Sequence, residues 1–139
     1  NAPNLWKGDY RGAADNIFCF AEEIFGRQFV IHDEKIAVFE SETGDLEIVA
    51  SSLEEWASKM LLDYNQMTGH RLAHEWQLRH GALRPRHRLM PKRPFVLGGE
   101  YSIENLASVD SVQMMKSLGN LAFQLHGLPD GAEVEFKIL

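Results

Sequence analysis

Three short apolar runs between residues 28 and 50 constrain the fold more than any other feature of the sequence. They cover 28–32, 35–40 and 46–50 and are rich in the β-branched and aromatic residues that favour strands. Asp33 and Glu34 form a two-residue connection typical of a tight hairpin, and Gly44 marks a second turn because glycine adopts positive φ without steric cost. A preceding apolar run over 17–22 has room for a buried strand. The pattern predicts an antiparallel meander.

The hydrophobic period then changes from that of a strand to that of a helix. Residues 52–67 carry apolar side chains at spacings of three and four, which predicts an amphipathic helix. Ser52 and Glu55 have the spacing of a capping box, and Gly69 suits the C-terminal stop. Trp56 lies on the apolar face, so we expect it in the core. A shorter helix is predicted over 70–80.

The remaining third combines irregular and regular patterns. Three prolines and a Gly-Gly pair predict a long irregular connection over 82–99. A strand is expected over 103–109, and Asp110 then caps a helix over 111–126. Residues 132–138 alternate between apolar and charged side chains, which predicts a final half-buried strand. Clustered strands, then helices and a closing strand indicate an α+β fold, mostly one antiparallel sheet with helices packed on it.

Charge is unevenly distributed along the 139 residues. The net charge is −6, but residues 1–63 carry −8, residues 64–94 carry +6 and residues 95–139 carry −4. No linker separates these segments, so we expect a single domain over 1–139 with an uneven surface. The net negative charge disfavours a general nucleic-acid binder. The single Cys19, expected as a packed core residue, and the lack of a long apolar run favour a cytoplasmic protein without a membrane span.

Motifs for catalysis, cofactors and metals are lacking in the sequence. His70 and His74 lie four residues apart on one predicted helix face, but no third ligand or HExxH arrangement accompanies them. Neither a Gly-x-Ser-x-Gly elbow nor a phosphate-binding glycine loop occurs. We therefore expect no catalytic, cofactor-binding or metal-binding residue, and a chain that is not an enzyme.

A basic segment within residues 79–93 leaves three interpretations open. Its cations can pair with the acidic ends of the same chain, contact an acidic protein partner, or bind phosphate in nucleic acid. Internal pairing is the simplest, because the flanking segments carry an excess of negative charge. The candidate anion-binding residues are Arg79, Arg84, Arg86, Arg88, Lys92 and Arg93.

Six segments carry a resemblance to a known family. They are NIFCFAEEIFGRQF (16–29), ETGD (42–45), LEEW (53–56), LAHEW (72–76), PFVLGGEY (94–101) and LPDG (128–131). Read in this order, they resemble the SUKH superfamily, the Smi/Knr-type domain of cell-wall synthesis regulators and bacterial immunity proteins. Many members begin with helices before the first segment, so the resemblance implies a domain that lacks them here.

The resemblance implies an α+β domain with no cofactor and no catalytic residues. It also implies a protein-binding role, in bacteria commonly that of an immunity protein that neutralises a toxin such as a nuclease. A nuclease attracts phosphate through a basic surface, which a complementary acidic surface would recognise. We therefore expect the partner-binding residues among the acids of the first segment. They are Glu22, Glu23, Asp33, Glu34, Glu40, Glu42, Asp45 and Glu47. The alternatives are a regulatory domain with another partner, or a nucleic-acid or anion-binding module that uses 79–93.

Overall fold

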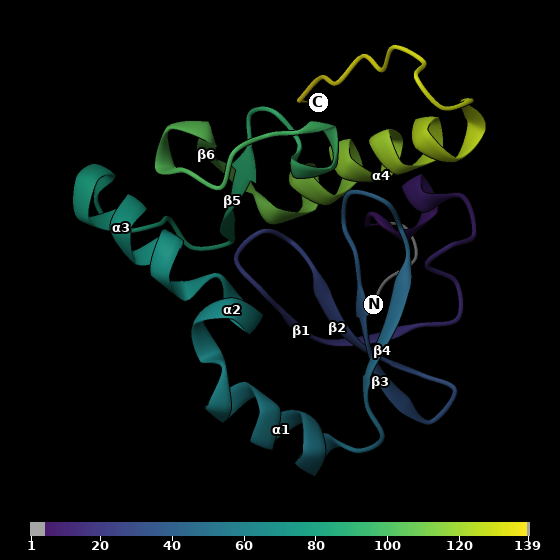
Figure 1. The fold of residues 1–139 in the computed structure, drawn as a ribbon, viewed down its shortest axis with the longest axis vertical. Helices are drawn as coiled ribbons and strands as arrows, with labels where there is room; N and C mark the ends of the chain where they lie inside the picture. The colour runs from purple at the N-terminus through teal and green to yellow at the C-terminus, as the bar shows by residue number, and fades with distance from the viewer. Residues whose placement is uncertain (1–4, 139) are drawn as a thin grey trace.

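The computed structural model describes residues 5–138, which form an α+β fold (Figure 1). Within these residues a four-stranded and a two-stranded antiparallel sheet are joined by helices. The first sheet has the order β1-β2-β3-β4, which confirms the predicted meander. Its strands are β1 (Phe18–Glu22), β2 (Gln28–His32), β3 (Lys35–Phe39) and β4 (Leu46–Ala50).

The turn between β2 and β3 explains why these strands pair in register. Asp33 and Glu34 have φ values of 47° and 62°, the positive values that a two-residue hairpin turn requires. His32 therefore lies opposite Lys35, and the register continues without a shift to Gln28 opposite Phe39. This hairpin turn and the connection from β3 to β4 lie at opposite ends of the sheet.

The main core lies between this sheet, a 3₁₀ helix η1 (Lys7–Tyr10) and the helix α4 (Ser111–Gly127). Its centre is an aromatic cluster in which the Tyr10 ring lies 4.9 Å from that of Phe39 and 5.5 Å from that of Trp6. Gly119 allows η1 to approach α4, since a Cβ there would lie 2.9 Å from the Cβ of Asp9. The aromatic rings thus fasten the N-terminal segment to the sheet.

A second sheet forms from β5 (His87–Pro91) and β6 (Leu106–Asp110). The expectation that 82–99 is wholly irregular was wrong, because β5 lies within it. Leu89 and Met90 in β5 are fully buried, and the pairing partner is remote in sequence, so the local proline signals concealed the strand. Two 3₁₀ helices, η2 (Phe95–Leu97) and η3 (Ile103–Asn105), complete the connection.

Asp110 caps α4 as predicted, since its Oδ1 accepts hydrogen bonds from the backbone of Val112 and Gln113. The final strand predicted over 132–138 was wrong: this segment is irregular and runs beside α4 (Figure 1). Val134 and Phe136 pack against the hydrophobic cluster on α4. The alternation of apolar and charged residues therefore reflects contact with this helix and not pairing with a neighbouring strand.

Three helices follow one another along one side of the molecule (Figure 1). They are α1 (Leu53–Leu62), α2 (Tyr64–Thr68) and α3 (His70–His80), and we call them the helical arm. The helix predicted over 52–67 therefore forms but breaks at Asp63. The Ser52 Oγ accepts from the Glu55 N–H at 3.1 Å, while the Glu55 carboxylate accepts from the Ser51 N–H at 2.8 Å. The capping box is thus present with its reciprocal bond shifted by one residue.

The burial expected for the first helix was wrong. Neither α1 nor α2 contains a buried residue, and Leu61 and Leu62 are 85% and 88% exposed. Trp56 is half-buried and packs edge-on against Phe20 and Phe29, with ring centroids 5.0 and 5.3 Å away. These two ring contacts join the start of α1 to the sheet.

Two further expectations concerned Cys19 and a membrane span. Cys19 is half-buried at the edge of the main core and not enclosed in it, and burial raises the pKa of its thiol. Among residues 5–138, no helix has the length and apolar character to cross a membrane.

Candidate functional site

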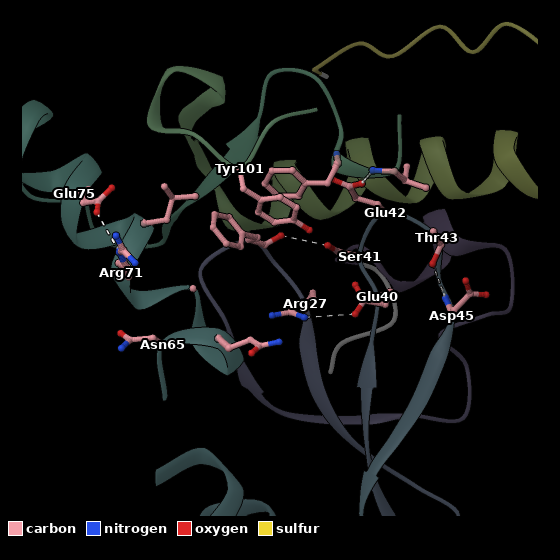
Figure 2. A pocket seen from close by; sticks show the side chains of 16 residues that line it. Arg27, Glu40, Ser41, Glu42, Thr43, Asp45, Asn65, Arg71, Glu75 and Tyr101 are labelled. Atoms are coloured by element: carbon pink, nitrogen blue, oxygen red, sulfur yellow. Dashed lines mark hydrogen bonds and ion pairs between the residues drawn. The ribbon is translucent and has the colours of Figure 1, made fainter. Parts of the chain in front are cut away.

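A cavity of about 950 Å³ opens where three distant segments of the chain meet (Figure 2). One side is the end of β3 and the connection to β4, another is α2 and α3 of the helical arm, and the third is the region of η2 and Tyr101. Its lining residues are Phe25, Arg27, Glu40, Ser41, Glu42, Thr43, Asp45, Asn65, Gln66, Gly69, Arg71, Leu72, Glu75, Phe95, Val96 and Tyr101.

Arg27 lies between two carboxylates at the base of the cavity. Its Nη1 is 3.6 Å from Glu40 Oε1 and its Nη2 is 3.6 Å from Glu23 Oε2. Glu23 is buried, and its Oε1 accepts hydrogen bonds from the backbone of Phe25 and Arg27 at 2.8 and 2.9 Å. Its Oε2 has no hydrogen-bond partner within the described chain. Burial raises the pKa of Glu23 to about 7, against the lowering effect of Arg27.

Glu42 fixes the loop between β3 and β4 to the third side of the cavity. Its two oxygens accept hydrogen bonds from the backbone N–H groups of Phe95 and Val96 at 3.0 and 2.7 Å. On the other side of the loop, His126 Nε2 donates to the Thr43 carbonyl at 2.7 Å. Burial raises the pKa of Glu42 above its usual value despite these two backbone donors. The loop is therefore held from both η2 and α4.

Aromatic rings form the wall above this base. Phe95 and Tyr101 are stacked with ring centroids 3.9 Å apart and planes 6° from parallel. Phe25 meets Phe95 edge-on at 5.4 Å. Phe25 is buried, whereas Tyr101 is 71% exposed, so the outermost ring of the stack keeps accessible surface at the cavity.

The helical arm supplies the facing wall. Arg71 and Glu75 lie across the cavity from Arg27 and Glu40, with Arg71 Nε 3.4 Å from Glu75 Oε1 (Figure 2). Gly69, with φ of 66°, brings the arm against the body, since a Cβ there would lie 2.6 Å from Phe25 Cε2. The lining carries four carboxylates and two arginines, so it has an excess of two negative charges.

The structure divides the predicted acidic surface. Glu40, Glu42 and Asp45 come together at the cavity as lining residues. Asp33 and Glu34 lie at the hairpin tip and do not line it, which separates them from the others.

The other three predicted acids also lie outside the cavity lining. Glu22 forms an ion pair with Arg88, with Nη2 to Oε2 of 3.0 Å. Glu23 is buried behind Arg27, and Glu47 is an exposed residue of β4. Three of the eight predicted acidic residues therefore line the cavity.

Much of the basic segment is engaged within the chain. Arg79 pairs with Glu104 at 2.8 Å, and Arg86 approaches Asp110 at 3.9 Å. These two contacts and the pair between Arg88 and Glu22 support the internal-pairing interpretation of the sequence.

The other cations of the segment lie at the surface. Lys92 Nζ donates to the Glu104 carbonyl and Arg93 Nε to the Leu97 carbonyl, at 2.8 and 2.9 Å. Arg84 is exposed. These residues lie outside the acidic cavity, so the structure separates the two candidate surfaces.

Sequence reasoning missed the aromatic wall and the arginine at the base. Phe95 and Tyr101 belong to the segment PFVLGGEY, which carried the family resemblance but no site prediction. Arg27 lies at the cavity because the start of β2 is paired with the end of β3. The spacing of residues in the sequence does not show that this end of the sheet lies near α3.

Two remaining observations concern ligands and relatives. The rings of His70 and His74 stack with centroids 5.9 Å apart, and the described residues contain no group of three or more side chains placed to hold a metal ion. We find no significant match to this chain among protein-family models, curated proteins or solved structures.

Proposed function

We propose that this chain is a non-enzymatic protein-binding domain of the SUKH type, and that it acts as a bacterial immunity protein that neutralises a cognate toxin such as a nuclease. The cavity is the observation that carries the proposal. It combines an excess of negative charge with a stacked aromatic wall, and its volume of about 950 Å³ admits side chains from a partner.

The charge of the cavity suits a basic partner. A nuclease surface that binds phosphate carries cations, and complementary charge accelerates the encounter and selects the partner. Exposed aromatic rings such as Tyr101 supply contact area at the centre of protein interfaces. Occupation of the phosphate-binding surface by this domain would exclude the toxin's substrate.

The competing nucleic-acid interpretation has weaker support. Arg79, Arg86 and Arg88 are in contact with acids of the same chain, which leaves fewer cations to neutralise phosphates. A regulatory domain with another basic partner would use the same cavity. We place the domain in the cytoplasm, where an intracellular toxin would act and where a single cysteine stays reduced.

Co-expression tests the proposal directly. The chain is produced in bacteria together with the product of the neighbouring reading frame, and survival and complex formation are measured. Protection together with a stable complex is the expected result. Normal growth with the neighbouring product alone, or toxicity without complex formation, would contradict the immunity function.

A matched pair of variants then tests the role of the cavity. Asp45→Asn with Glu75→Gln removes two charges at the rim, and Asp33→Asn with Glu34→Gln removes two at the hairpin tip. We expect the rim variant to slow association about tenfold at low salt and the hairpin variant to slow it less than about twofold. Equal effects of the two variants would contradict the cavity as the contact surface.

A further inference from the structure

We propose that the cavity receives an arginine side chain of the partner, which stacks on the Tyr101 ring and pairs with the Glu40 carboxylate. The inference rests on the proposed function and names the partner group that the cavity recognises. It implies that Arg27 moves from Glu40 towards Glu23 when the cavity is filled.

The aromatic wall favours a flat cation. The Tyr101 ring is backed by Phe95 at 3.9 Å and is 71% exposed, so it presents a supported ring face to an incoming group. A guanidinium is planar and weakly hydrated, and it stacks on such a face better than an ammonium does. The carboxylates of Glu40 and Glu42 line the same cavity as the ring and add negative potential near it.

The base of the cavity holds an exchangeable ion pair. Arg27 is shared between Glu23 and Glu40 at 3.6 Å from each, longer than a direct charge-assisted hydrogen bond of about 2.8 Å. Glu23 Oε2 is buried and lacks a hydrogen-bond partner in the described structure, so a closer approach of Arg27 would give this oxygen a hydrogen bond. Glu40 lines the cavity with its side chain 36% exposed, so it is accessible to a second guanidinium.

The remaining lining suits an arginine within a peptide. Asn65 and Gln66 on the helical arm supply amide donors and acceptors for flanking backbone. The excess of two negative charges disfavours an anion, although Arg27 and Arg71 are present. A lysine would satisfy the charge but neither the ring stacking nor the two-point contact with a carboxylate.

An NMR titration of the whole chain with short peptides tests the inference. The probes are acetyl-Gly-Arg-Gly-amide and the same peptide with lysine or with citrulline, the uncharged analogue of arginine. We expect amide shifts that gather around residues 27, 40 and 95–101. The arginine peptide should bind at least about fivefold more tightly than the lysine peptide, and the citrulline peptide should not saturate. Equal affinities for the arginine and lysine peptides, or amide shifts centred on the hairpin tip at Asp33 and Glu34, would overturn the proposal.

Three variants locate the contact without relying on a buried residue. Tyr101→Leu should remove the preference for arginine, and Tyr101→Phe should retain it. Tyr64→Leu is the matched control, because Tyr64 is half exposed on α2 and does not line the cavity. An arginine preference that survives Tyr101→Leu, or that is lost equally in Tyr64→Leu, would overturn the proposal.

The partner complex separates this inference from the function on which it rests. We expect Tyr101→Leu to weaken the complex with the neighbouring-frame product at least about tenfold, as at an interface centre. An unchanged complex would overturn the arginine contact and leave the immunity function standing. Absence of any complex with the unaltered chain would instead contradict the proposed function.

Discussion

The main core and the helical arm both carry apolar patterns that predict burial, but the two regions bury their apolar side chains to very different extents. Phe39 is fully buried, and the rings of Tyr10 and Trp6 lie 4.9 and 6.0 Å from its ring. In the arm, α1 and α2 contain no buried residue, although their apolar spacing is that of a core helix. An amphipathic period therefore shows what a helix can bury, while a neighbouring element decides what it does bury.

The arm is attached to the body near its two ends. Trp56 packs on Phe20 and Phe29 at one end, and Ala73 and Trp76 join the core cluster of Phe25 at the other. The arm also forms one wall of the cavity. The candidate site thus combines a base next to the sheet with a wall in which α2 contains no buried residue, as expected for binding regions.

The largest test of this contrast compares a core residue with an arm residue. Phe39→Ala should lower the free energy of unfolding by about 3–5 kcal/mol, because it opens a cavity in the aromatic cluster. Leu62→Ala should change it by less than about 0.5 kcal/mol, since the side chain is 88% exposed. Urea denaturation of both variants measures the difference. A cost for Leu62→Ala similar to that for Phe39→Ala would show that the arm is packed in solution.

Glu23, between the core and the cavity base, gives a pH test. Its folded pKa of about 7 lies above the usual 4.5, so its contribution to stability is complete below about pH 4.5 and is lost as pH rises through 7. Glu23→Gln removes this loss. The free energy of unfolding of the variant, relative to that of the unaltered chain, should therefore rise by about 2 kcal/mol from pH 5 to pH 8. Denaturation at both pH values checks the result. The same difference between the two proteins at both pH values would contradict it.

Gly69 tests the attachment of the arm. Gly69→Ala combines a φ of 66° with a Cβ only 2.6 Å from Ile24 and Phe25, and should cost about 1–3 kcal/mol. Hydrogen exchange should become faster in α2 and α3 than in β2 and β3. Gly127→Ala is the control, because nothing lies within 4 Å of its added Cβ. Uniform acceleration over the whole chain would show that arm and core unfold as one unit.

The smallest expected effect concerns the basic segment. Arg88→Gln removes the pair with Glu22, whose side chains are 30% and 21% exposed, and should cost about 0.5–1 kcal/mol. Arg84→Gln is the exposed control and should be neutral in the same thermal denaturation experiment. A neutral result for Arg88→Gln would weaken the interpretation that these cations serve the fold.

Local patterns predicted the elements whose signals lie within a few residues. β2, β4 and α3 have the predicted bounds, and Asp110 caps α4 as expected. β5 was missed and the final strand over 132–138 was wrong, because strand formation depends on a partner that alternation does not reveal.

The candidate site was predictable only in its acids. Glu40, Glu42 and Asp45 stood in a segment of marked negative charge, and the structure gathers them at the cavity. Arg27 joins them through the pairing of β2 with β3, and Tyr101 joins them through the contact of Glu42 with Phe95 and Val96, which lie more than fifty residues further along the sequence.

Hydrogen exchange of the chain with and without the neighbouring-frame product tests the central claim most directly. The cavity as partner site predicts protection on complex formation in the segments 40–45, 65–75 and 95–101, which line it. The hairpin tip at Asp33 and Glu34 should exchange at an unchanged rate. Protection confined to that hairpin, or to the basic segment 79–93, would contradict the account.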